Sequence, residues 1–487
     1  MTGAGSGPGQ ADELREDGTS HSAAVAALLA GAAALGGFLF GYDSSVINGT
    51  VDALKREFGL GGFAVGFVVS AALLGCAAGA WFAGPLSDRI GRVRVMLIAA
   101  GLFVISSLGS ALAFSAVDLT AWRLVGGLAI GAASVIAPAY IAEIAPAELR
   151  GRLGSLQQMA IVLGIFAALV VDYVIARVSD GGATGTFPWG GGAWRWMFAS
   201  AVVPAVMYGV IATTIPESPR YLVKKHETAR ARQVLRRVMG RGDVDVKITE
   251  IGRSIAVDRP VRLGDLRGDR LGLMPIVWAG ILLSVFQQFV GINVIFYYSS
   301  SLWQAVGFSE NDAMLTSVIN SIVNVAFTLV AIALVDRIGR RPLLLAGAAG
   351  MAVALGTLTV CFATAPVVDG KPDLGGVAGP VALVAANVFV ASFAATWGPV
   401  VWVMLGEMFN NFIRASALAV AAAAQWLANW VITTTFPGIS GFSLGLAYGL
   451  YTLFSILAFL FVLRAVPETK GRELEDMDGL ASPRSRA

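Results

Sequence analysis

Ser87–Arg92 reads Ser-Asp-Arg-Ile-Gly-Arg, and Asp336–Arg341 reads Asp-Arg-Ile-Gly-Arg-Arg. The shared Asp-Arg-Ile-Gly-Arg begins at positions 88 and 336, and each copy lies between two long apolar runs. A duplicated set of apolar helices with matched charged loops is typical of membrane transporters built from two repeated halves. The repeat therefore predicts the class of fold.

Two looser pairs of charged motifs recur in the same order. They are Glu143 with Arg150 against Glu407 with Arg414, and Pro216-Glu217-Ser218 against Pro467-Glu468-Thr469. In both Glu–Arg pairs the arginine follows the glutamate by seven residues. The whole chain, and not one loop alone, thus reads as two related halves.

The composition indicates a membrane protein. The chain of 487 residues is 56% hydrophobic and 14% charged, whereas soluble domains carry about 25% charged residues. A helix needs about 20 apolar residues to span a bilayer. About twelve such runs lie near 23–47, 62–84, 93–113, 120–142, 153–176, 196–215, 274–297, 313–335, 342–364, 380–405, 415–435 and 443–464. The sequence predicts an all-α membrane protein with twelve transmembrane helices in two six-helix halves, joined by a short cytoplasmic helical domain.

Five segments follow from this division. They are a disordered cytoplasmic N-terminal tail (1–22), an N-terminal half (23–216), a cytoplasmic helical linker (217–272), a C-terminal half (273–464) and a cytoplasmic C-terminal tail (465–487). Basic residues concentrate in the loops that twelve spans place on the same side as both termini, and basic loops are typically cytoplasmic. We expect a multi-pass protein of the cell membrane with both termini inside. The first 22 residues lack the basic n-region of a signal peptide.

Few ionisable side chains lie within the spans, where each costs about 2.5–3.5 kcal/mol. Asp43 ends the first span, and Arg123 lies in the fourth. Our hypothesis is that they pair across a central cavity, and that protonation of Asp43 frees Arg123 to move. The alternative is that Asp43 is a helix-end residue facing the aqueous outer side. Asp172 is interpreted as reaching water at the end of the fifth span.

Amide side chains form a second group of polar residues on apolar helices. They are Gln157 and Gln158, Gln287, Gln288 and Asn293, Asn324, and Gln425. Amides offer neutral hydrogen bonds in both directions, which suits hydroxyl groups and predicts a hydrated cavity for a neutral polyhydroxyl ligand. Hydrogen bonding between helices is the alternative. Trp402 could offer its ring to the C–H face of a pyranose, or it could be a packing residue or an interfacial anchor.

The sequence disfavours an enzyme. His21 and His226 lie outside the spans, and the Gly-rich phosphate loop of ATP-driven proteins is absent from the sequence. We expect no cofactor, no bound metal and no nucleic-acid partner. Cys76 and Cys361 lie in apolar runs and are interpreted as packing residues.

From about Leu35 to Gly471 the chain resembles the sugar porters of the major facilitator superfamily, most nearly the bacterial proton-coupled glucose and xylose symporters. The motifs that carry the resemblance are Gly41–Asp43, Asp88–Arg92, Glu143 with Arg150–Arg152, Pro216–Arg220, Gln287–Asn293, Asp336–Arg341 and Pro467–Gly471. The resemblance implies a sugar site of Gln158, Gln287, Gln288, Asn293, Asn324, Trp402 and Gln425. It also implies a cavity lining or outer gate at Phe40 and Tyr298, to which we add the adjacent Tyr297.

The resemblance further implies that Asp43 carries the proton and that Arg123 responds to it, since uncoupled members typically have Asn at the position of Asp43. We expect the charged motifs to form a cytoplasmic latch that holds the two halves together: Asp88, Arg92, Glu143, Arg150, Glu217, Asp336, Arg340, Glu407, Arg414 and Glu468. The alternative is that they only anchor helix ends and set topology.

The predicted function is proton-coupled symport of a neutral monosaccharide into the cell by alternating access. D-glucose is the first choice of substrate and D-xylose the second. The alternatives left open are an uncoupled sugar facilitator and a polyol or inositol–proton symporter. The expected partners are the sugar, the proton and membrane lipids, and we expect a functional monomer.

Overall fold

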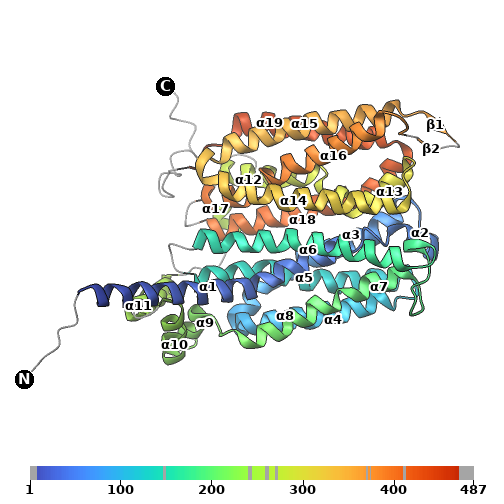
Figure 1. The fold of residues 1–487 in the computed structure, drawn as a ribbon. Coiled ribbons are helices and arrows are strands. Elements are labelled where there is room, and N and C mark those ends of the chain that lie inside the picture. Colours follow the sequence, from blue (N-terminus) through green and yellow to red (C-terminus); the bar gives the residue numbers. More distant parts are fainter. Residues whose placement is uncertain are drawn as a thin grey trace, which may run out of the picture.

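The computed structural model describes residues 8–145, 150–239, 244–257, 263–268, 272–368, 371–372, 374–409 and 413–470. Within these residues, twelve helical segments are long and apolar enough to cross a membrane. The predicted all-α membrane fold with twelve spans is therefore confirmed. In Figure 1 the helices of the first half, in blue and green, form one layer, and those of the second half, in yellow and red, form another.

The first half contains α1 (Pro8–Ser45), α2 (Val51–Phe58), α3 (Gly62–Ile90), α4 (Arg92–Ala111), α5 (Ala116–Ile144), α6 (Arg150–Val178), η1 (Gly182–Thr184), α7 (Ala193–Ser200) and α8 (Val202–Thr214). Between the halves lie α9 (Pro219–Lys224), α10 (Thr228–Met239), α11 (Val244–Val257) and η2 (Leu263–Leu266). The second half contains α12 (Pro275–Phe289), α13 (Ile292–Ala305), α14 (Glu310–Ile338), α15 (Arg340–Thr364), α16 (Ala378–Ala394), α17 (Trp397–Met408), α18 (Arg414–Phe442) and α19 (Leu444–Ala465). The short strands β1 (Val367–Val368) and β2 (Lys371–Pro372) form a hairpin.

The N-terminal segment differs from the sequence expectation. We expected residues 1–22 to be a disordered tail, but α1 begins at Pro8 and continues without a break into the first span. A helix already formed by a span needs no new nucleus to extend, so residues of ordinary helix propensity can prolong it. Residues 1–7 lie outside the described part of the chain.

Three of the twelve spans are each made of two helices. The sixth consists of α7 and α8, the seventh of α12 and α13, and the tenth of α16 and α17. In the seventh span α12 ends at Phe289 and α13 begins at Ile292, directly after Gly291, whose φ of +86° is in the left-handed region that favours glycine. The periodicity of apolar residues alone does not reveal such breaks.

Glycines allow the helices to approach one another closely. A Cβ atom at Gly127 of α5 would overlap the carbonyl oxygen of Ala72 in α3, and one at Gly41 of α1 would overlap that of Ile161 in α6. Small residues at helix contacts are typical of membrane bundles, where packing replaces the hydrophobic effect as the main source of association. Close contacts of this kind join α5 to α3 and α1 to α6, the helices that surround Asp43 and Arg123.

The two ends of the bundle differ. One end, which we call the basic end, carries α9–α11 and the charged loops at Asp88–Arg92 and Arg337–Arg341 (Figure 1). The other, which we call the hairpin end, carries α2 and the β1–β2 hairpin (Figure 1), and η1 packs against α2 there.

Candidate functional site

The structure brings Asp43 and Arg123 together. Nη1 of Arg123 lies 2.9 Å from Oδ2 of Asp43 and also donates to the Asp43 carbonyl oxygen at 3.3 Å. The exposed fraction is 4% for Asp43 and 2% for Arg123. The alternative interpretation of Asp43 as a residue facing water is therefore wrong in this conformation. Each charge is compensated chiefly by the other, because Nε of Arg123 has no hydrogen-bond partner among the described residues.

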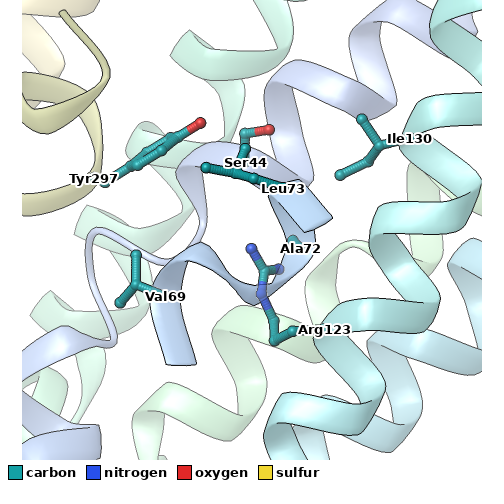
Figure 2. A pocket seen from close by; sticks show the side chains of 7 residues that line it. All are labelled: Ser44, Val69, Ala72, Leu73, Arg123, Ile130 and Tyr297. Atoms are coloured by element: carbon teal, nitrogen blue, oxygen red, sulfur yellow. The ribbon is translucent and has the colours of Figure 1, made fainter. Parts of the chain in front are cut away.

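A small cavity lies beside the guanidinium of Arg123. Figure 2 shows it between helices of both halves, lined among others by Ser44 of α1, Leu73 of α3 and Tyr297 of α13. The hydroxyl groups of Ser44 and Tyr297 are drawn on the same side of this space (Figure 2). Two hydroxyl groups therefore line a space beside the Arg123 guanidinium that is about the size of one water molecule.

Four predicted amides form one hydrogen-bonded chain, which we call the amide chain: Asn293, Gln288, Gln287 and Gln425. Asn293 donates to Oε1 of Gln288, and Gln288 donates to Oε1 of Gln287 at 3.3 Å. Gln425, on α18, donates to the same Oε1 at 2.8 Å. Gln287 in turn donates to the carbonyl oxygens of Trp397 and Gly398 at 2.9 and 3.2 Å.

The broken spans explain why these amides meet. Gln287 and Gln288 lie in the last turn of α12, and Asn293 lies in the first turn of α13, on the two sides of the break at Gly291. The acceptors for Gln287 lie at the start of α17, directly after the break in the tenth span. Non-helical backbone at membrane depth is tolerated where it lines a cavity or is buried in protein. The breaks thus direct the amides of the seventh span and the carbonyl groups of the tenth toward one place, where Gln425 of the unbroken α18 joins them.

The amide chain retains free hydrogen-bonding capacity. Oε1 of Gln425 is buried and has no hydrogen-bond partner among the described residues. Each carboxamide offers two donors and two acceptor lone pairs, and the chain uses only part of them. Such a group of atoms is suited to several hydroxyl groups of a neutral ligand.

The remaining predicted ligand-site residues are arranged less closely. Gln158 is half-buried on α6 and Asn324 is 6% exposed on α14, and the described structure shows neither hydrogen-bonded to the amide chain. Trp402 is 43% exposed, and its part in the site stays a prediction.

The predicted gate residues lie near the contact between the halves, and one of them, Phe40, contacts the other half. The ring of Phe40 lies 5.6 Å from that of Trp426 on α18. Tyr297 lines the cavity beside Arg123. Tyr298 is 2% exposed and donates to the carbonyl oxygen of Thr433 at 2.9 Å.

Sequence reasoning missed two polar or aromatic residues that the structure places among the spans. Trp426 follows Gln425 directly and faces Phe40. Asn320 lies one helical turn before Asn324, is 1% exposed, and has both carboxamide atoms without a partner among the described residues. The spacing of four residues between Asn320 and Asn324 is the signal that could have identified it.

At the basic end, the charged motifs pair within each half. Arg92 bonds Glu143 at 2.8 Å and Asp88 at 3.0 Å in the first half. Arg340 bonds Glu407 at 2.8 Å in the second half. In this conformation these pairs do not form the predicted latch between the halves. Arg414 donates to the carbonyl oxygen of Phe409 at 3.4 Å, and the side chains of Arg150 and Asp336 lie outside the described part.

Two glutamates of the predicted latch cap helices instead. Glu217 accepts from the backbone N–H groups of Arg92 and Val93 at the start of α4. Glu468 accepts in the same way from Arg340 and Arg341 at the start of α15, at 3.1 and 3.0 Å. A carboxylate at a helix N-terminus satisfies otherwise unpaired donors and compensates the positive end of the helix dipole. The repeated Pro-Glu motifs thus attach the end of each half to its own loop.

We predict that Glu468→Gln lowers the melting temperature at neutral pH by about 1–2 °C, the size expected for a lost cap in a large protein. Partial burial, the largest single influence, raises the pKa of Glu468, but four backbone N–H donors together lower the pKa by more, to a value below that of an ordinary glutamate. A lowered folded-state pKa means that the stabilisation is complete above the unfolded-state pKa and is lost as pH falls through the folded-state pKa.

The measurement is thermal unfolding in detergent at pH 7 and about pH 4. The difference between wild type and Glu468→Gln should shrink at the lower pH. Glu227→Gln, which removes an exposed carboxylate paired with Arg230, is the control and should change little. A difference that grows on acidification would contradict the capping role.

At the hairpin end, contacts join the two halves directly. Asn48, after α1, donates to the carbonyl oxygen of Phe296 in α13 at 2.9 Å, and its own carbonyl accepts from Ser300 at 2.8 Å. Ser70 of α3 and Thr434 of α18 are 2.6 Å apart. Two carboxylates also bridge the halves there: Asp52 accepts from Ser301 at 2.8 Å, and Glu310 accepts from the backbone N–H of Ala183. The hairpin end is therefore closed.

Comparison with known proteins gives consistent results. The family model described as "Sugar (and other) transporter" matches residues 29–481. The chain is 54% identical over 451 residues to the glucose transport protein of Synechocystis sp., covering 92% of this chain and 96% of the relative. It is 39% identical over 490 residues to the D-xylose-proton symporter of Escherichia coli K12, covering 93% and 95%. The inward-open structure of the E. coli xylose transporter XylE has a TM-score of 0.78 at 38% identity, covering 92% of this chain and 98% of that one.

Proposed function

The chain belongs to the sugar transporter family as a major facilitator sugar porter, and from that premise we propose that it brings a neutral monosaccharide into the cell together with a proton. It is a multi-pass membrane transporter and not an enzyme. D-glucose is the first choice of substrate, because the relative with 54% identity is a glucose transport protein. D-xylose is the second, since the relative with 39% identity is a D-xylose-proton symporter.

The observation that carries proton coupling is the buried pair of Asp43 and Arg123 beside a cavity. Asp43 binds the proton when the hairpin end is open, and the neutral carboxyl releases Arg123 toward the space near Ser44 and Tyr297. Tyr297 lies on α13, the same helix whose first turn carries Asn293 of the amide chain. A movement of Arg123 that displaces Tyr297 can thus shift Asn293 in the sugar site, because both residues lie on α13.

The amide chain supports a sugar as the ligand. Its atoms are neutral and can donate and accept, and the charges of Asp43 and Arg123 compensate each other, so that no net charge remains there for an ionic substrate. The unpaired Oε1 of Gln425 and the exposed ring of Trp402 offer a hydroxyl acceptor and an apolar face. We propose that the sugar binds here, with Gln158 and Asn324 completing the site when the cavity closes.

Alternating access accounts for the unequal ends of the bundle. The basic end carries the arginine-rich loops and is assigned to the cytoplasm. The halves contact each other at the hairpin end, and the charged motifs at the basic end pair within each half. We therefore assign this conformation to the inward-facing state, in agreement with its similarity to an inward-open relative. In the outward-facing state, the same charged motifs become available to join the halves.

The test is uptake of labelled D-glucose and D-xylose into proteoliposomes with an imposed proton gradient. One proton moving through 100 mV gains about 2.3 kcal/mol, which would support about 50-fold accumulation at one proton per sugar. Accumulation above the external concentration, with sugar-dependent proton entry, is the expected result. Equilibration without accumulation would identify an uncoupled facilitator, and transport of inositol in place of both sugars would identify a polyol symporter.

We predict that Gln287→Ala weakens the apparent affinity for sugar about tenfold or more. The substitution removes a potential ligand and leaves Gln288 and Gln425 without their shared acceptor, and the loss of one or two hydrogen bonds costs about 1.4 kcal/mol. The measurement is the KM for uptake. Asn387→Ala is the matched control, since among the described residues the Asn387 amide donates to the Leu383 carbonyl of its own helix, α16, and to no other helix. Equal KM values for the two variants would argue against this site.

A further inference from the structure

Asp172, on α6, is a second acidic residue buried among the spans. Contrary to the expectation that it reaches water, it is 2% exposed. Its Oδ2 accepts from the backbone N–H of Gly49 at 3.2 Å, and its Oδ1 has no hydrogen-bond partner among the described residues. Unlike Asp43, it has no cation paired with it in the part of the chain that the structure describes.

The charged groups on the elements packed against α6 have partners elsewhere. They are Asp43 with Arg123, Asp118 with the Phe114 N–H, Glu143 with Arg92, Arg195 with Glu57, Glu310 with the Ala183 N–H, and Asp312 with Ser309. Arg337 of α14 is exposed at the opposite, basic end, and Arg177 of α6 itself is exposed. Tyr42 of α1 is a nearby titratable group, and its hydroxyl bonds Ser200 at 2.7 Å. An ionised Asp172 would thus be stabilised by one backbone N–H alone, which is unfavourable for a carboxylate out of water. The closed conformation is compatible with the neutral, protonated carboxyl.

The contact of Asp172 is with the segment that closes the hairpin end. Gly49 lies between α1 and α2, and a Cβ atom there would come within 2.9 Å of the Asp172 carboxyl group. The neighbouring Asn48 makes the two hydrogen bonds to α13 of the other half. The Asp172 carboxyl group therefore contacts the backbone next to Asn48, a residue that joins the two halves. Opening this end separates Asn48 from α13 of the other half. The Asn48–Gly49 segment, and Asp172 beside it, would then face water.

We infer that Asp172 is a second proton-binding group, distinct from Asp43, and that it must take up a proton for the hairpin end to close. The inference rests on the proposed alternating access. In the open state a proton from the water at the hairpin end forms the O–H bond of the carboxyl group, and on reopening this bond breaks and the proton returns to the same side. Asp172 thus moves no net proton across the membrane. It makes closure of the hairpin end dependent on the pH at that face.

The test measures opening of the hairpin end without sugar transport. Ser70→Cys places a thiol at a residue that is fully buried between α3 and α18 when this end is closed. The background carries Asp43→Asn, which removes the other titrating carboxyl, and alanine at Cys76 and Cys361. Maleimide labelling from the hairpin side is followed from about pH 5.5 to about pH 8.5. Labelling of Val117→Cys, at a residue that is 81% exposed at the same end, corrects for the reactivity of the thiol itself.

The corrected labelling rate should rise with pH, by up to about tenfold per pH unit where Asp172 titrates. With Asp172→Asn, which can still accept from Gly49, it should stay low and flat. Asp172→Ala, also neutral, should be equally flat, so the test does not depend on one variant. Asp180→Asn, which removes an exposed carboxylate eight residues further along the chain, should leave the rise intact.

A rise that persists in both neutral variants would overturn the inference and assign the pH dependence to Asp52 or Glu310. A flat profile with Asp172 intact would also overturn it. Failure of the proposed symport would appear separately, as absence of sugar accumulation in proteoliposomes. The labelling experiment could still be interpreted, because it does not depend on sugar transport.

Discussion

Asp43→Asn is expected to abolish accumulation of sugar while leaving exchange of sugar across the membrane intact. Asparagine has the shape of the protonated aspartate but cannot release a proton, so the proton gradient no longer drives the cycle. Both conformations remain accessible when sugar is bound on either side. The ratio of internal to external sugar concentration should fall to about one, which is the equilibrium value when no proton gradient drives uptake. The measurement is uptake under a proton gradient together with exchange of preloaded sugar.

The substitution also leaves Arg123 without its carboxylate, and breaking a buried ion pair by removing one partner costs about 3–5 kcal/mol. Size-exclusion chromatography and thermal unfolding therefore accompany the transport data. The double variant Asp43→Asn with Arg123→Gln removes both charges and should recover stability without recovering accumulation. Glu227→Gln, a substitution of an exposed acidic residue paired with Arg230 between the halves, is the control and should keep accumulation. Concentrative uptake by a folded Asp43→Asn protein would exclude Asp43 as the proton carrier.

Gly66→Leu is expected to stop delivery of sugar to the inside while sugar still binds from the outside. Gly66 lies on α3 at the hairpin end, where a Cβ atom would overlap the carbonyl oxygen of Thr434 on α18. The two helices belong to different halves, so the leucine can be accommodated when this end is open. Overpacking of about 3 kcal/mol would lower the population of the closed state more than 100-fold.

Two quantities are measured for Gly66→Leu and compared with the wild type. Sugar binding, measured by tryptophan fluorescence, should be retained, and the initial rate of uptake should fall. Gly84→Leu is the matched control, because Gly84 lies on the same helix with no atom within 4 Å of an added Cβ. Normal uptake by Gly66→Leu would mean that α3 and α18 need not meet during transport. Loss of the folded protein peak would mean that this contact belongs to the fold and not to the cycle.

The number of spans and the position of the amides at Gln287, Gln288 and Asn293 could be predicted from the sequence. Long apolar runs have few other solutions in a bilayer, and an amide or a charge among them is rare enough to be noticed. The pairing of Asp43 with Arg123 was a hypothesis, since 80 residues separate them. Their contact requires α1 and α5 to pack closely, which the glycines permit but do not dictate.

Other features could not be predicted. Asp172 was expected to reach water, because its place near the end of a span gives no indication of what covers it. The charged motifs were expected to join the halves, but Arg92 and Arg340 pair within their own halves in this conformation. A transporter changes the contacts between its halves during each cycle, and one sequence encodes both arrangements. The conformation of the transporter, and not the sequence of a motif, therefore determines which of these contacts form.

By itself the sequence determined the twelve spans, the twofold repeat, and the few polar side chains that a membrane interior would otherwise exclude. These follow from local properties, namely the cost of polar groups in hydrocarbon and the length needed to cross it. Which of those side chains meet depends on how the helices pack in three dimensions. This packing joined the amides of α12, α13 and α18 at broken helices, and it left Asp172 with a single donor behind the closed hairpin end. Contacts between distant helices depend on how closely the backbones approach, and that distance is set by packing across the whole bundle.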